Sequence, residues 1–362
     1  MTIESMNKKF LQTIFNQFEV DASFLSFESL ASGHINDTFL IHTSKEPTVI
    51  LQRMNHHVFK NVPGLIENKV AISKHLLYKL QKLPNTELQR KVLQFIPAKN
   101  QQSYAVDDEG NYWNMMIYID QSVTLEKVTS PEIAYEGGKL FGEFLHLTSD
   151  FDASQLTEVL PKFHDMSFRF QQFDTALQTA SAYRKKEASE LLQKVEDLRT
   201  EMHILQHLKE SGQLKIRVTH NDTKLSNALF TKEFKGLCVI DTDTVMPGIV
   251  HYDFGDAIRT FCNNAPEDEQ NLDVVTFQVP YYKAYLQGFL EMIGHELSEI
   301  EIKYLPLAAK TMIFIMALRF LTDYLNNDVY YKTAYPTHNL VRAKNQFQLI
   351  KSFNENYQQL II

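Results

Sequence analysis

Two clusters of polar residues, each directly after a short apolar segment, lie in the second half of the chain. They are residues 220–227, with the sequence HNDTKLSN, and residues 241–243, with the sequence DTD. Carboxylate and amide oxygens are ligands that Mg²⁺ prefers, a carboxylate can accept a hydroxyl proton, and an ammonium group can offset charge on a phosphoryl group. The spacing, H-x-D-x-K-x-x-N followed by an aspartate after an apolar strand, is typical of phosphoryl transfer.

Each residue of this set can be given one role in such a reaction. We predict that Asp222 accepts the proton of the acceptor hydroxyl and that Lys224 lies beside the transferred phosphoryl group. Asn227 and Asp241 are predicted to hold Mg²⁺, and Asp243 is either a further ligand or a carboxylate behind the ligands. A single aspartate or asparagine after a strand is most often a turn residue or a helix N-cap, so the prediction depends on the joint pattern.

Two nearby residues are predicted to shape the site and not to react. His220 should hold the loop through hydrogen bonds, and Asp253 should lie at the start of a helix and support the backbone of that loop. The only cysteines are Cys238 and Cys262, too few for a disulfide framework or a zinc site. Both are predicted to fill apolar space.

The elements that must position these residues change in character along the chain. The first third contains a predicted helix at 6–18, a second at 65–80, and strands at 24–32, 37–43, 47–53, 90–95, 103–106 and 112–119. The rest contains predicted helices at 130–148, 181–211, 280–293, 299–325 and 339–360, with short strands at 214–219 and 236–240. This order predicts an α+β fold with a small antiparallel β-rich lobe (1–119), a larger helical lobe (120–362) and a cleft between them.

Composition limits the partners of the protein. The 362 residues include 36 Lys plus Arg and 44 Asp plus Glu, a net charge of −8, which argues against nucleic-acid binding. The first 20 residues lack the pattern of a signal peptide, and the apolar stretch at 312–320 is too short to cross a bilayer. We therefore expect a cytoplasmic protein that uses no membrane, and the sequence leaves its oligomeric state open.

The chain resembles the aminoglycoside phosphotransferase and choline kinase superfamily, small-molecule kinases with a protein-kinase-like fold, over most of its length. The segments that carry a closer resemblance, to the N-acetylhexosamine 1-kinase branch, are 32–38 (SGHINDT), 51–55 (LQRMN), 220–227, 241–248 (DTDTVMPG) and 318–324 (LRFLTDY). This resemblance implies ATP and Mg²⁺ as cofactors and the 1-hydroxyl of N-acetylglucosamine or N-acetylgalactosamine as the acceptor. Many superfamily members have His-Gly-Asp where this chain has His-Asn-Asp at 220–222, although the choline-kinase side also has asparagine there.

The resemblance also implies residues that contact the nucleotide. Gly33 would allow a tight turn over the phosphates, and either Gln52 or Arg53 occupies the strand position from which such kinases place a cation on the α- and β-phosphates. Glu67 is the candidate partner of that cation; if Gln52 faces the cleft, this ion pair is absent. Ile117 and Ile119 lie at the expected hinge beneath the adenine.

The residues implied for the sugar are His34, Asn36, Arg319 and Tyr330. A guanidinium inside the apolar segment 312–321 costs several kcal/mol unless it is paired with a helical acid or faces a wet cleft. The resemblance favours the cleft, where a planar donor and a phenol suit the hydroxyls and the amide carbonyl of an amino sugar.

Two alternatives remain at this stage. The first keeps the reaction and changes the acceptor to choline, homoserine or an aminoglycoside; a cationic acceptor would need an acidic or aromatic cage, and an arginine would repel it. The second is a non-catalytic nucleotide-binding protein with the same fold, which would bind nucleotide and form no product.

Overall fold

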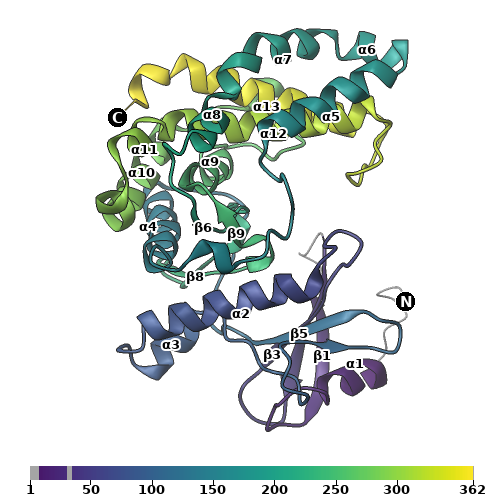
Figure 1. The fold of residues 1–362 in the computed structure, drawn as a ribbon, viewed down its shortest axis with the longest axis vertical. Helices are drawn as coiled ribbons and strands as arrows, with labels where there is room; N and C mark the ends of the chain where they lie inside the picture. Colours follow the sequence, from purple (N-terminus) through teal and green to yellow (C-terminus); the bar gives the residue numbers. More distant parts are fainter. Residues whose placement is uncertain (1–7, 31–34, 362) are drawn as a thin grey trace.

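The computed structural model describes residues 8–30 and 35–361, which fold into two lobes (Figure 1). Gly33 and His34 lie outside the described residues. The N-terminal lobe is an antiparallel sheet with the order β1-β2-β3-β5-β4, made of β1 (Phe24–Leu30), β2 (Asp37–Thr43), β3 (Val49–Arg53), β4 (Ala105–Val106) and β5 (Tyr112–Ile117). Its helices are α1 (Lys8–Phe15), α2 (Val62–Lys79) and α3 (Asn85–Lys91).

The two faces of this sheet have different surroundings. Phe39, Leu51 and Trp113 are buried on one face, in an apolar core that includes α1. Because successive side chains of a strand point to opposite faces, Gln52 on β3 faces the other side, where it lines a cavity. The apolar core thus decides which residues of β3 reach the cleft between the lobes.

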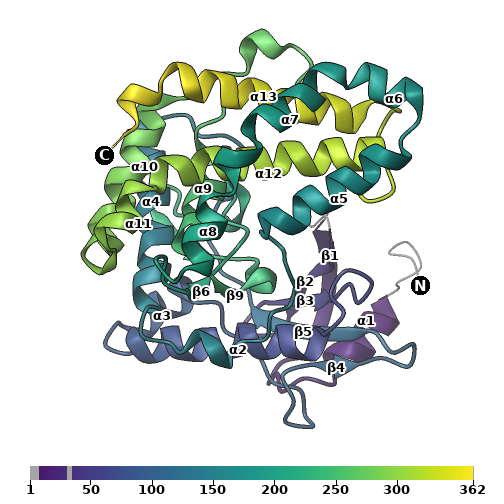
Figure 2. The same ribbon diagram turned by 45° about the horizontal axis from the view of Figure 1, so that its top comes forward.

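The C-terminal lobe is mainly helical, as the sequence predicts. Its helices are α4 (Pro131–Leu147), α5 (Met166–Thr179), α6 (Ala182–Glu187), α7 (Ser189–Met202), α8 (Ile204–Glu210), α9 (Val250–Phe261), α10 (Val279–Ile293), α11 (Glu299–Lys303), α12 (Leu305–Leu325) and α13 (His338–Glu355). Two small antiparallel ladders pair β6 (Arg217–Thr219) with β9 (Met246–Gly248) and β7 (Ala228–Phe230) with β8 (Gly236–Val239). Figure 2 shows α12 across the middle of this lobe and α13 on the side of α12 away from α2.

Helix α12 is the central helix of the C-terminal lobe. It is long and apolar enough to cross a membrane, but 83% of its most apolar window is buried inside the protein. It packs against α5, α9 and α13. The apolar character of this helix is therefore explained by its place in the core.

The structure differs from the sequence predictions of local structure in several places. The single helix predicted at 181–211 is three helices, α6, α7 and α8, of which the last two place Leu191, Met202 and Leu205 in the core. In the strand predicted at 90–95, the first two residues end α3 and the rest has no regular structure apart from one bridge between Phe95 and Met116. Helix α5 was not predicted at all, because Met166, Phe168 and Phe170 alternate with polar residues as in a strand.

Candidate active site

The two polar clusters meet because they flank one β-hairpin. Asn227 directly precedes β7 and Asp241 follows β8, and these strands pair with Ala228 opposite Val239. The Ile240 N–H donates to the Asn227 carbonyl at 2.9 Å, which extends the ladder to the polar residues. A local hairpin thus brings the loop at 220–227 next to the acidic segment at 241–243.

The carboxylate of Asp222 is held by two neighbours in the same loop. Its Oδ2 accepts hydrogen bonds from Lys224 Nζ and Asn227 Nδ2, both at 3.0 Å. Burial by itself would raise the pKa of Asp222, but the Lys224 ammonium group and its hydrogen bond bring that pKa below its usual value. Among the described residues nothing donates to Oδ1, so an ionised oxygen is available to an incoming hydroxyl group.

The backbone of this loop adopts a conformation that favours glycine or asparagine. Asn221 has a φ of 64°, in the left-handed region. Its side-chain Nδ2 donates hydrogen bonds to the carbonyls of Thr219 at 3.2 Å and Thr244 at 3.1 Å. Asparagine, in place of the glycine common in the superfamily that the sequence resembles, is therefore compatible with this left-handed backbone.

Asp253, in the first turn of α9, accepts hydrogen bonds from the backbone of the loop at 220–227. Its two carboxylate oxygens accept the N–H groups of His220 and Asn221, each at 2.7 Å. Burial raises the pKa of Asp253 to about 6. His220 is fully buried; its Nε2 hydrogen-bonds the Ile240 carbonyl at 2.9 Å, which ties the loop to the segment that carries Asp241.

Asn227 and Asp241 present oxygens suited to a hard cation. The Asn227 amide nitrogen is used by Asp222, and no donor in the described part of the chain bonds its Oδ1. Asp241 likewise has no hydrogen-bond partner among these residues, and both residues line the same cavity. The surrounding protein, with the carboxylates of Asp243 and Asp222, raises the pKa of Asp241 to about 7. This crowding of negative charge fits a bound divalent cation.

Asp243 differs from Asp241 because both of its oxygens are engaged by side chains. Oδ1 forms a buried ion pair with Lys69 of α2, and Oδ2 accepts a hydrogen bond from the Asn36 amide. Of its two predicted roles, this geometry favours a carboxylate behind the metal ligands. The Asn36 side chain also binds the neighbouring strand end, because its Oδ1 accepts the Asn55 N–H at 2.8 Å; one N–H of its amide has no partner among the described residues, and its contact with a sugar stays a prediction.

A cavity of about 560 Å³ lies between the sheet and the C-terminal lobe. Its walls include Leu40, Ile50, Gln52, Met116, Ile117 and Ile119 from the first third of the chain, and Lys224, Asn227, Leu229, Asp241 and Asp243 from the rest. One part is therefore apolar and the other carries the charged groups, which suits a flat base and a polyphosphate. Ile117 and Ile119 lie in its wall, at the positions expected for the hinge.

The predicted cation of β3 is not at this cavity. Gln52 faces it, whereas Arg53 points to the opposite face of the strand and pairs with Asp37, its neighbour on β2. Glu67 is exposed on α2 and is no partner of either residue. The predicted pair of Arg53 and Glu67 is therefore wrong, because the apolar face of β3 at Leu51 places Arg53 on the side away from the cleft.

Arg319 lines a second cavity, of about 220 Å³, formed by α5, α12 and residues 326–331. No carboxylate in the described part of the chain lies within ion-pair distance of its guanidinium, which instead lies over the rings of Phe163 (5.3 Å), Tyr330 (5.8 Å) and Tyr331 (5.5 Å). The alternative of a structural ion pair with a helical acid is not what the structure contains. The guanidinium of Arg319 instead makes cation–π contacts and lines the cavity.

The sequence prediction missed three residues that line this second cavity, Arg169, Asp323 and Tyr331. Asp323 accepts the N–H groups of Tyr330 at 2.8 Å and Tyr331 at 2.9 Å, and so holds both tyrosines beside Arg319. Arg169 lines the same wall, and burial together with the charge of Arg319 lowers its pKa to about 10. A usable signal was Asp323 four residues after Arg319, a second charged position in an apolar helix.

His164 contacts the loop at 220–227, and its neighbour Phe163 lies against Arg319 of this cavity. Its Nε2 lies 3.3 Å from the Asn221 carbonyl, and its ring contacts Tyr252. Burial, together with the charges of Arg169 and Arg319, lowers the pKa of His164 to about 3, and the Asn221 hydrogen bond and Asp222 act in the opposite direction. The imidazole is thus neutral, and it links Phe163, whose ring lies against Arg319 of the second cavity, to the backbone of Asn221.

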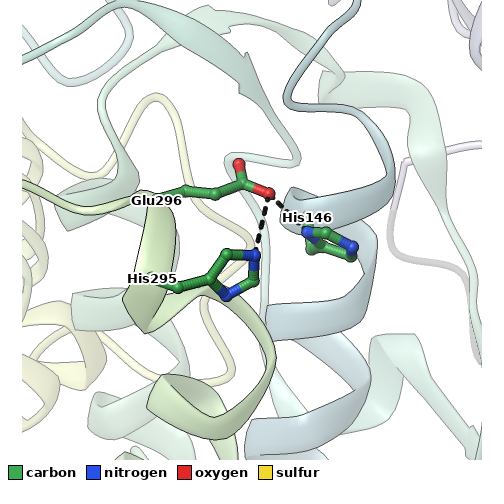
Figure 3. A group of neighbouring side chains, drawn as sticks. All are labelled: His146, His295 and Glu296. Atoms are coloured by element: carbon green, nitrogen blue, oxygen red, sulfur yellow. Dashed lines mark hydrogen bonds and ion pairs between the residues drawn. The ribbon is translucent and has the colours of Figure 1, made fainter.

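A further group of potential metal ligands lies away from both cavities. His146, in the last turn of α4, forms an ion pair with Glu296, and His295 Nε2 lies 3.6 Å from the same carboxylate oxygen (Figure 3). The Glu296 carbonyl is in turn bound by Arg217 at 3.2 Å. These contacts connect the end of α4 to the segment after α10, and none of these residues lines either cavity.

Comparison with known proteins agrees with this geometry. The model of the phosphotransferase enzyme family APH matches residues 26–292. An aminoglycoside phosphotransferase from Alicyclobacillus acidocaldarius is 13% identical with a TM-score of 0.65, covering 98% of each chain. A microcompartment-associated aminopropanol kinase is 16% identical with a TM-score of 0.63, covering 98% of this chain and 99% of the other. A choline kinase from Cryptosporidium parvum is 14% identical with a TM-score of 0.60, covering 98% of each chain.

At these identities the structures establish a shared fold, that of kinases with a β-rich and a helical lobe. The family match covers well over half of the chain and includes the loop at 220–227 and the acids at 241–243. The chain belongs to the phosphotransferase enzyme family APH.

Proposed function

We propose that the protein is an ATP-dependent kinase that phosphorylates the anomeric 1-hydroxyl of an N-acetylhexosamine. The observation that carries the choice of acceptor is the small cavity, with Arg319 unpaired by any carboxylate of the described chain and Tyr330 against it. A guanidinium and a phenol are hydrogen-bonding groups suited to hydroxyls and to an amide carbonyl.

The charged groups of the small cavity favour a neutral sugar over a cationic acceptor. Two guanidinium groups, Arg319 and Arg169, line it, and its one carboxylate, Asp323, is already used by backbone N–H groups. An ammonium acceptor such as choline or an aminoglycoside would meet two like charges there against one carboxylate. A neutral sugar meets no such penalty.

In the reaction that we propose, the acceptor hydroxyl lies against the free Oδ1 of Asp222. The hydroxyl oxygen attacks the γ-phosphorus of ATP, the bond from that phosphorus to the bridging oxygen breaks, and ADP leaves. Asp222 is ionised at neutral pH because Lys224 lowers its pKa, so it can orient the hydroxyl group and take its proton. Lys224, also on the wall of the large cavity, reduces the negative charge on the transferred group.

The residues present fit a magnesium ion. Asn227 Oδ1 and the Asp241 carboxylate would hold it, since both are without partners among the described residues and share the cavity. When bound, Mg²⁺ would neutralise charge on the nucleotide phosphates. Asp241, whose pKa the neighbouring carboxylates raise, would then remain ionised at neutral pH.

The test is a panel of acceptors incubated with ATP and Mg²⁺, with the phosphomonoester detected and located by phosphorus NMR. N-acetylglucosamine and N-acetylgalactosamine should give the sugar 1-phosphate. Glucose and galactose would show whether the acetamido group is required, and choline, homoserine and an aminoglycoside represent the other acceptors. Product from an amine and none from any sugar would refute the proposal, and nucleotide binding without any product would indicate a non-catalytic protein.

A further inference from the structure

The large cavity contains a buried ammonium group that no sequence pattern identified. Lys69 of α2 lines this cavity, and its side chain is 2% exposed. Its Nζ pairs with Asp243, lies 3.2 Å from Gln52 Oε1 and is 5.5 Å from the centroid of the Phe95 ring. Among the described residues that line the cavity, the only other basic side chain is Lys224.

Lys69 lies on the buried face of α2, at a position where an apolar residue is expected. It follows Leu65 by four residues and precedes Ile72 by three, and both of these are fully buried. A buried ion pair recovers at most part of its desolvation cost, and apolar side chains of similar volume would serve packing as well. A charge retained there, on the wall of a cavity, indicates a role in binding.

The location of the ammonium group relative to β3 identifies that role. In protein kinases a lysine on β3 contacts the nucleotide phosphates and is held by a glutamate on the following helix. Here β3 carries Gln52 and the following helix carries Lys69, so the positive group comes from the helix. Because Lys69 Nζ reaches the end of the Gln52 side chain, it occupies the space that a lysine at position 52 would fill.

We propose that Lys69 is the phosphate-binding cation of this protein, supplied from α2 in place of β3, with Asp243 as the carboxylate that holds it. The proposal rests on the proposed function in requiring a nucleotide, and it is independent of the acceptor. It assigns Asp243 to positioning Lys69 and leaves the metal to Asn227 and Asp241.

The attachment of α2 supports this placement. Asn68, the residue before Lys69, is 3% exposed and donates from Nδ2 to the carbonyls of Thr157 at 2.8 Å and Val245 at 2.9 Å. Its Oδ1 accepts the Thr157 N–H at 2.9 Å. Val245 lies two residues after Asp243, so the helix is fixed to the same segment that carries the partner of Lys69.

The test compares the binding of ADP and adenosine by calorimetry, since only ADP has phosphates. Lys69→Gln should weaken ADP about ten- to a hundredfold, the effect of losing one charge-assisted contact, and leave adenosine within about twofold. The exchange variant, Gln52→Lys with Lys69→Gln, returns an ammonium group to the same space from β3 and should restore most of the ADP affinity. Lys310→Gln is the matched control, because Lys310 is also buried, pairs with Glu201 and lines neither cavity.

Each result decides the matter. Unchanged ADP affinity in Lys69→Gln would overturn the proposal, as would an equal loss of ADP and adenosine, which would mean that Lys69 only supports the fold. If Lys69→Gln does not fold, the exchange variant, which keeps both side chains, must bind ADP more tightly than Gln52→Met with Lys69→Gln, or the proposal fails. A protein that binds ADP through Lys69 and phosphorylates no sugar would refute the proposed acceptor alone.

Discussion

Asn227 binds Asp222 twice through one amide nitrogen, at 2.8 Å to its backbone carbonyl and at 3.0 Å to its carboxylate. This contact orients the amide so that Oδ1 of Asn227 is directed away from Asp222, and it leaves Oδ1 of Asp222 unbonded among the described residues. The group that would accept a proton and the group that would bind a metal are therefore positioned by the same side-chain contact.

Asp222→Asn should retain the fold and nucleotide binding and lose most of the turnover. The amide has nearly the same shape, but it cannot accept the hydroxyl proton, and general-base contributions are typically about 10²- to 10⁴-fold. The measurement is kcat with the best acceptor of the panel, together with ADP affinity by calorimetry. A variant with near-normal kcat would exclude Asp222 as the base.

Asp241→Asn should change the response to Mg²⁺ more than the response to the acceptor. Replacing the carboxylate removes a charged metal ligand while the neutral amide retains an oxygen, so a higher Mg²⁺ concentration should be needed for half-maximal activity. The measurement is initial rate against Mg²⁺ at fixed ATP, with the acceptor KM as the control. An unchanged Mg²⁺ profile would argue that Asp241 is no ligand.

Arg319→Met should raise the acceptor KM about tenfold or more and leave the ATP KM nearly unchanged, because its guanidinium lines the small cavity and not the large one. Arg199→Met provides the matched control. Arg199 also lies over a ring, that of Phe170 at 4.3 Å, but on α7, outside both cavities. Equal effects of the two variants would contradict a specific role for Arg319.

Asn221→Gly should be tolerated better than Asn221→Ala. Both substitutions remove the hydrogen bonds from Nδ2, but only glycine adopts a φ of 64° without strain, and the left-handed conformation costs other residues about 1–2 kcal/mol. The difference in free energy of unfolding between the two variants, measured in urea, should therefore have about this size. Equal stability would mean that the backbone at this position can change its conformation.

Acid should destabilise the protein partly through His251. This residue is fully buried, and burial lowers its pKa from 6.5 to about 4. The folded state then binds fewer protons than the unfolded state, so the contribution is complete above pH 6.5 and is lost as the pH falls toward 4, up to roughly 3 kcal/mol. His251→Gln should flatten the dependence of the free energy of unfolding on pH in this range. An unchanged slope would show that His251 does not contribute to it.

That the residues of the loop at 220–227 and Asp241 lie together was predictable because their contacts are local. Asp222, Lys224 and Asn227 lie within six residues, and Asp241 reaches them through a hairpin whose two strands are adjacent in the sequence. The two-lobed α+β arrangement followed for a similar reason, since strand and helix periodicity are properties of short segments.

Contacts between segments distant in the sequence could not be predicted in this way. Alternation alone does not say whether Gln52 or Arg53 faces the cleft; that depends on which face of β3 packs against α1 and the neighbouring strands. Likewise, Lys69 in the sequence is one lysine in an amphipathic helix, and only the docking of α2 brings it to Asp243, 174 residues away.

The sequence by itself therefore determined which groups could react, because their spacing within one loop and one hairpin sets their geometry. Tertiary structure decided which charges accompany them. It placed Arg53 away from the cleft and Arg319 beside a cavity without a carboxylate partner in the described chain, and it supplied Lys69 from α2. The physical reason is that the surroundings of a buried charge depend on how helices and sheets pack, and neighbouring residues in the sequence do not specify that packing.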